Sequence, residues 1–172
     1  MLFKPEMIKQ ILAGKKTMTR RMVKVNEGLN KTGFVYQTYE RLEGIKIRVK
    51  WMLGRKYAVC PGRGKPQVWY CPYCKKIAFK NSSGFMVTTC LCYTEETPLF
   101  IKLVSIRKEK LLDITEEDAK KEGFKDTQSE DVDLSAKQNF LDTFQKINKL
   151  RTGEFGTLTE DPDVWVLEVK VV

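Results

Sequence analysis

Hydrophobic residues recur along the chain with two different periods, and these separate predicted helices from predicted strands. A helical period runs through residues 5–13, and Gly14 follows it as a stop signal. The same period runs through 135–150, where Ser135 and Gln138 form a capping box at the start. Both segments are therefore predicted to be amphipathic helices.

A third helix is predicted at 113–124 from the signals at its two ends. Thr115 suits the N-cap position, and acidic residues fill the first turn. Gly123 supplies the stop, so this helix is expected to be short.

Strands are predicted where apolar and polar side chains alternate. In residues 17–25 this alternation places two threonines and Arg21 on one face and Arg20 on the other. The segments with strand character are 17–25, 34–42, 45–51, 55–60, 98–111 and 163–172. Several separate strands with a few short helices favour an α+β fold, namely a small mixed β-barrel decorated by short helices.

Composition and charge place this fold among soluble proteins with an affinity for polyanions. The chain has 172 residues, of which 42% are hydrophobic, so we expect a single domain over 1–172. The net charge of +9 is uneven, with +10 over 1–56, +6 over 57–110 and −7 over 111–172. This segregation predicts a basic face suited to RNA, although a lysine-rich solubilising surface is the alternative. Short apolar runs and a start without a signal-peptide core indicate a cytoplasmic protein with no membrane partner.

The chain contains no histidine. A Ser-His-Asp or Cys-His catalytic arrangement is therefore excluded, and so is any metal site with a histidine ligand. Acid–base chemistry would have to use Lys, Glu, Asp, Tyr or Cys side chains.

Four of the five cysteines lie within residues 67–94, which we interpret as an inserted module. They form a CxxC pair and a CxC pair, namely Cys71, Cys74, Cys90 and Cys92. Four thiolates from two turns suit a closed, structural Zn²⁺ site, so the module is predicted to be a zinc ribbon. A redox CxxC motif or two disulfides are the alternatives, but the βαβ context of a redox motif is absent.

Basic and aromatic residues accompany the cysteines in this module. They would suit contact with a nucleic acid by charge and stacking, or equally form the small core and solvated rim of the ribbon. Over the whole chain, the predicted nucleic-acid contacts are Lys15, Lys16, Arg20, Arg21, Arg63, Lys65, Lys75 and Lys76.

Four segments follow one another along the chain: ILAGKKTMTRR (11–21), YAVCPGRGKP (57–66), LLDITEEDAKKEGF (111–124) and VWVLEVKVV (164–172). Together they resemble the motifs of the ASCH domain family, and the resemblance covers the chain apart from the cysteine module. It implies a PUA-like β-barrel with a cleft lined by the first and third motifs. The chain is longer than the compact members, because it adds residues 26–51 and the cysteine module.

The resemblance also implies functions. Members of the family are thought to bind RNA, some are similar to a bacterial amidohydrolase that deacetylates 4-acetylcytidine, and others are described as ribonucleases. In the amidohydrolase-like members the catalytic residues match Lys16, Thr19 and Glu122 of this chain. A buried lysine beside other cations would have a lowered pKa and act as a base, with the threonine as nucleophile and the glutamate exchanging protons. Alternatively, Glu122 pairs with Lys16 or Arg21 and ties its helix to the barrel without catalysis.

Three functions are compatible with these features. The first is an RNA-binding domain whose basic cleft recognises a nucleotide or a modified base. The second is a hydrolase that acts on a nucleoside or RNA through the three matched residues. The third is an adaptor that docks a protein partner through the zinc ribbon. The large basic surface favours the first.

Overall fold

The computed structural model describes residues 1–41, 44–61, 67–80, 86–87, 92, 97–128, 133–150 and 160–172. The helices are α1 (Pro5–Leu12), α2 (Glu116–Lys121) and α3 (Ala136–Asn148), with a 3-10 turn η1 (Leu111–Asp113) before α2. The strands of the main sheet are β1 (Met18–Met22), β5 (Lys56–Ala58), β10 (Phe100–Lys110) and β13 (Asp163–Val171). The other strands are β2 (Glu27–Leu29), β3 (Phe34–Arg41), β4 (Gly44–Met52), β6 (Trp69–Tyr70), β7 (Ile77–Lys80), β8 (Met86–Val87), β9 (Thr97–Pro98), β11 (Thr127–Gln128) and β12 (Asp133–Leu134).

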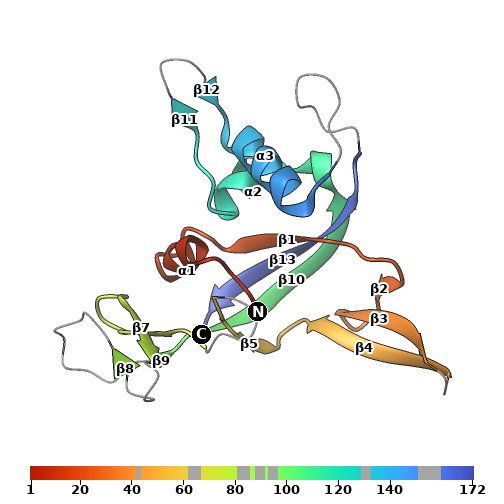
Figure 1. The fold of residues 1–172 in the computed structure, drawn as a ribbon, viewed down its shortest axis with the longest axis horizontal. Coiled ribbons are helices and arrows are strands. Elements are labelled where there is room, and N and C mark those ends of the chain that lie inside the picture. The colour runs from red at the N-terminus through yellow and green to blue at the C-terminus, as the bar shows by residue number, and fades with distance from the viewer. Residues whose placement is uncertain are drawn as a thin grey trace.

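The main sheet has the strand order β1-β13-β10-β5, and every neighbouring pair is antiparallel. Figure 1 shows the long strands β10 and β13 side by side through the middle of the molecule. The sheet curls into half a barrel. Four consecutive residues of β13, 164–167, are buried. Because successive side chains point to opposite faces, both faces of the sheet must be covered there.

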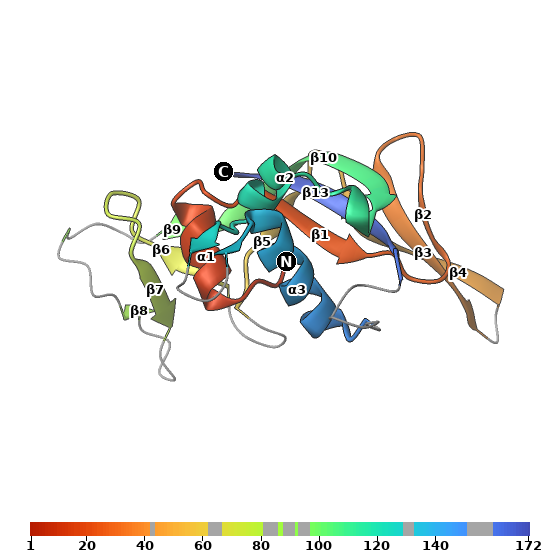
Figure 2. The ribbon, with the colours of Figure 1, turned by 90° about the horizontal axis from the view of Figure 1, so that it is seen from above.

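Two hydrophobic clusters cover these faces. One cluster packs α1 against the sheet and contains Ile8 and Trp165. The other packs α2 and α3 against the sheet and contains Phe140 and Val166. In Figure 2 the three helices gather around β1. The first three residues of the strand that carries the first predicted motif, 18–20, are buried.

Two small sheets extend from opposite ends of the main sheet (Figure 1). The cysteine module forms a sheet with the order β8-β7-β6-β9, and the segment added after β1 forms β2-β3-β4. Residues 45–51 were predicted to alternate, and they do lie in β4. However, the apolar side chains of Ile45 and Ile47 are 70% and 66% exposed, so neither face of the outer part of this strand is covered.

The predicted helices are confirmed with slightly shorter bounds. The side chains of Thr115 and Ser135 each accept a hydrogen bond from the backbone N–H three residues on, at 3.1 and 3.2 Å, which confirms both as N-caps. The second bond of the predicted capping box is not seen among the described residues, because the Gln138 side chain donates to Asp142 Oδ1 at 2.8 Å. The strand predicted at 98–111 is instead two strands that meet at Leu99. The chain changes sheets there, because β9 pairs with β6 whereas β10 pairs with β13.

The fold is mixed α/β and rich in sheet, as predicted. Of the predicted loop at 61–66, only Pro61 lies within the described residues. Among the helices that the structure describes, none is long and apolar enough to span a membrane.

Candidate functional site

Two glycine turns bring the start of β1 and the end of α2 together. Gly14 after α1 has a φ of 70° and Gly123 after α2 has a φ of 94°, a conformation that glycine adopts without strain. The backbone N–H of Thr17 then donates to the carbonyl of the last residue of α2 at 2.9 Å. These turns place Lys16 beside Glu122, which caps the C-terminus of α2.

Lys16 and Glu122 form a buried ion pair. The Lys16 Nζ donates to the carboxylate Oε2 and to the backbone carbonyl of Glu122, both at 2.7 Å. The two residues are only 2% and 3% exposed. A cation at this position is favourable because the carbonyl groups at a helix C-terminus carry partial negative charge. Of the two partners that the sequence offered for Glu122 as an alternative to catalysis, Lys16 and Arg21, the structure pairs it with Lys16.

Burial is the largest influence on the Lys16 ammonium, and it lowers the pKa of this group below its usual value near 10.5. The Glu122 carboxylate acts in the opposite direction and raises the pKa, whereas the nearby guanidinium groups lower it further. A lysine with a lowered pKa can give up its proton more easily and act as a base.

Arg20 lies in an internal network of carboxylates. Its guanidinium donates to Glu109 Oε1 at 2.5 and 3.0 Å, to Asp118 Oδ2 at 2.7 Å and to Glu122 Oε1 at 3.5 Å. Its side chain has no exposed area. Among the described residues, no buried side-chain N or O atom lacks a partner. Arg20 was predicted to contact nucleic acid. It lines the pocket, and its guanidinium binds the carboxylate of Glu122 there.

Arg21 faces the other way, as the strand alternation predicts. Its Nη2 donates to the backbone carbonyl of Leu2 at 2.7 Å, and its guanidinium lies 5.7 Å from the ring centre of Phe3. Within the described part of the chain, no carboxylate lies within ion-pair distance of Arg21. Because the Glu122 carboxylate already binds Lys16, the Arg21 guanidinium adds a positive charge to this part of the pocket.

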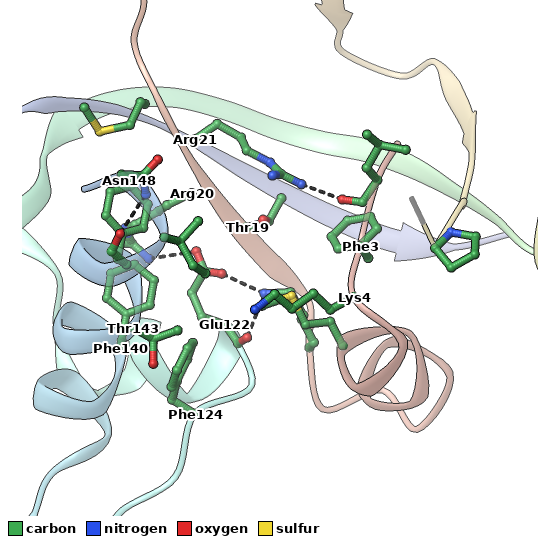
Figure 3. A pocket seen from close by; sticks show the side chains of 17 residues that line it. Phe3, Lys4, Thr19, Arg20, Arg21, Glu122, Phe124, Phe140, Thr143 and Asn148 are labelled. Atoms are coloured by element: carbon green, nitrogen blue, oxygen red, sulfur yellow. Dashed lines mark hydrogen bonds and ion pairs between the residues drawn. The ribbon is translucent and has the colours of Figure 1, made fainter. Parts of the chain in front are cut away.

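These groups line a pocket of about 270 Å³. Its polar floor contains Lys16, Thr19, Arg21 and Glu122, and its wall contains Phe3, Phe124, Phe140 and Phe144. Thr19 is 5% exposed, so the floor lies deep. Figure 3 shows Phe3 and Arg21 on one side and Phe124 and Phe140 on the other, with Glu122 between them. The pocket brings the three residues of the predicted catalytic set together.

Helix α3 contributes a side of the pocket that sequence reasoning missed. Phe140 and Phe144 belong to the hydrophobic period that predicted an amphipathic helix at 135–150, but they also form the pocket wall. Thr143 and Asn148 line the pocket as well. They follow the two phenylalanines by three and four residues, and polar residues at that spacing next to an apolar stripe are the signal that could have found them.

The other predicted nucleic-acid contacts lie at different places. Lys15 is exposed beside the pocket strand. Lys75 and Lys76 are exposed in the cysteine module, where the Lys75 Nζ lies 5.3 Å from the ring centre of Tyr70. Arg63 and Lys65 lie outside the described residues.

The sulfur atoms of Cys71, Cys74 and Cys92 all lie within 4.8 Å of one another, so this group could hold a metal ion. The turn between the first two is closed by the N–H of Lys75, which donates to the carbonyl of Cys71 at 3.0 Å. None of the cysteines that the structure describes is in a disulfide, which does not support the disulfide alternative. Cys90, the fourth predicted ligand, lies outside the described residues.

Comparison with known proteins does not assign this pocket to a family. No protein-family model, curated protein or solved structure matches the chain.

The buried pair makes a prediction for the titration of Lys16. In an NMR titration of the lysine side chains, the Lys16 signal should titrate at lower pH than those of the exposed lysines. The Glu122→Gln substitution should lower the pKa further because it removes the stabilising charge. Since the folded pKa lies below the unfolded one, the contribution of Lys16 to stability should rise as the pH increases toward 10.5.

The Lys16 signal should be missing in Lys16→Met and unchanged in Lys15→Gln. Titration of Lys16 together with the exposed lysines would contradict this account.

Proposed function

We propose that the protein binds RNA and holds one base of it in the pocket between α3, β1 and the N-terminal segment. The observation that carries this proposal is the combination of aromatic walls and a positively charged floor in one pocket. Unpaired bases of RNA bind by stacking on aromatic rings and arginine planes, and by hydrogen bonds from their edges. A volume of about 270 Å³ is below the range of sites for drug-sized ligands, so it suits a single base.

The ASCH resemblance supports the same assignment. The motif at 11–21 supplies Lys16, Thr19 and Arg21, and the motif at 111–124 supplies Glu122, so the pocket lies between the two motifs that should line the cleft. On this basis the curled main sheet belongs to a PUA-like barrel. Lys15 is exposed near the pocket and offers charge to the phosphates on either side of the bound base.

The RNA-binding proposal predicts a specific loss in Arg21→Gln. Binding of a fluorescein-labelled single-stranded RNA of 12 nucleotides, measured by anisotropy, should weaken about tenfold because a charged hydrogen bond is lost. The salt dependence of log K should fall by about 0.7. Lys24→Gln is the matched control, because it makes the same change in charge at an exposed position just beyond β1. Equal affinities of wild type and Arg21→Gln would refute the proposal.

A second function, hydrolysis of an acylated base, is favoured by the lowered pKa of Lys16 in a pocket that also contains Thr19. In this proposal, neutral Lys16 takes the proton of the Thr19 hydroxyl while the Thr19 oxygen attacks the acyl carbonyl carbon. The amide C–N bond breaks, the proton passes to the leaving nitrogen, and water then hydrolyses the threonine ester to release acetate. Glu122 holds Lys16 in position and exchanges protons with it.

The hydrolase proposal predicts that the wild type converts 4-acetylcytidine to cytidine and acetate, which chromatography separates. Thr19→Val, which keeps the shape of the side chain, and Lys16→Met should each slow turnover by about 10²- to 10⁴-fold. Lys15→Met should keep full activity, since its side chain is exposed. If the wild type shows no turnover, or if Thr19→Val is as active as wild type, the site does not catalyse this reaction.

The metal of the cysteine module is proposed to be Zn²⁺, with Cys90 as the fourth ligand beside Cys71, Cys74 and Cys92. Thiolates bind Zn²⁺ at about 2.3 Å in a tetrahedral arrangement. The three described sulfur atoms, all within 4.8 Å of one another, are close enough to bind one such ion. Such a closed site braces its module rather than doing chemistry. The adaptor function remains a prediction, and loss of a protein partner on removal of residues 67–94 would test it.

Elemental analysis of the purified protein should therefore find one zinc per chain. Cys74→Ser should release the metal and lower the thermal stability of the module, because a ligand is lost. Cys60→Ser is the control and should keep the zinc, since Cys60 is not part of the cluster. A wild-type protein without stoichiometric zinc would show that the assignment is wrong.

A further inference from the structure

Three lysines lie directly opposite one another across three adjacent strands of the main sheet. Lys102 of β10 is the register partner of Lys56 on β5 and of Lys170 on β13. Residues in register lie on the same face of a sheet, and all three lysines are exposed. We call Lys56, Lys102 and Lys170 the lysine ladder.

The lysine ladder carries charge that the protein does not neutralise. Within the described residues, none of the three makes an ion pair or a side-chain hydrogen bond. The nearest acidic residue along β13 is Glu168, two positions before Lys170, and it is bound by Arg107 at 2.9 Å. Like charges directly opposite across two strands are destabilising, so the free protein accepts a cost here.

The other end of the same strands is arranged differently. Lys108 and Lys110 of β10 both pair with Asp163 of β13, at 2.8 and 3.2 Å. Lysines at that end have an acidic partner across the sheet, whereas those of the ladder face other lysines. The contrast indicates that the charge of the ladder is complementary to something outside the chain.

One end of the ladder lies near the segment that leads into the pocket, although Lys170 is on the opposite face of β13 from Leu167, the register partner of Thr19. The backbone N–H of Val169, next to Lys170, donates to the carbonyl of Thr17 at 2.8 Å. The ladder therefore begins beside the segment that carries Lys16 and crosses the sheet to β5, at the end where the C-terminus lies (Figure 1).

We propose that the lysine ladder binds the phosphate backbone of the RNA whose base occupies the pocket. This inference rests on the proposed RNA binding and adds the path that the RNA backbone takes across the sheet. Neighbouring strands lie about 4.8 Å apart, so the row spans roughly 10 Å and can reach more than one phosphate. Neutralising phosphates releases counterions, which compensates for bringing the three lysines together.

The test compares two double variants with the same change in net charge. Lys102→Gln/Lys170→Gln removes two ladder lysines, and Lys108→Gln/Lys110→Gln removes two lysines of β10 that share the carboxylate of Asp163. Binding of the labelled single-stranded RNA is measured by anisotropy over a range of salt concentrations. Binding of cytidine monophosphate to the pocket is measured by NMR.

The ladder variant should lose about 1.4 from the slope of log K against log salt for RNA, since each phosphate contact contributes about 0.7. It should keep the wild-type affinity for cytidine monophosphate, and its thermal midpoint should stay or rise. The control variant should keep a slope close to that of the wild type.

Equal loss of slope in both variants, or no loss in the ladder variant, would overturn the inference while leaving the pocket assignment intact. If RNA binding depends on the ladder but cytidine monophosphate does not bind, the pocket assignment fails and the ladder assignment stands. Tighter binding of polyglutamate than of RNA, lost in the ladder variant, would show that the partner is an acidic protein and would also overturn the inference.

Discussion

The buried ion pair between Lys16 and Glu122 is the constraint around which the rest of the site is arranged. Its ammonium binds both the side chain and the backbone carbonyl of the same residue, and thereby joins the start of β1 to the end of α2. Removing one partner of a buried pair typically costs about 3–5 kcal/mol, because the other charge is left in an apolar region. Replacing both partners by apolar residues is often harmless, so stability alone does not explain why two charged groups stand here.

The surroundings of the pair form one side of a pocket. Arg20, itself bound by Asp118, donates a hydrogen bond to the Glu122 carboxylate. Aromatic side chains of α3 and of the N-terminal segment line the pocket next to the pair. The pair is therefore fixed in position before any ligand binds. Binding then does not have to order these side chains, which lowers its entropic cost. In both proposed functions, this preorganised charge would act on the ligand, either a bound base or a reacting acyl group.

Local signals were sufficient to predict the helices and their caps from the sequence, because Thr115 and Ser135 act through contacts within one turn. The meeting of Lys16 with Glu122 followed from the ordered motifs, since no local pattern joins residues so far apart. The polar residues beside the apolar stripe of α3 were a weak hint of a pocket, but whether Phe140 covers only the core or also a pocket depends on how the helix crosses the sheet. Likewise, alternation identified the faces of β4, but only the packing shows that Ile45 and Ile47 remain exposed.

A crystal structure of the protein with a bound nucleoside monophosphate would test the central claim most directly. We expect the base between Phe3 and Phe140, with one of its polar edges within hydrogen-bond distance of Lys16 or Thr19, and its phosphate toward Arg21. A nucleotide bound elsewhere while the pocket stays filled with solvent would contradict the assignment of this pocket as the site of base recognition.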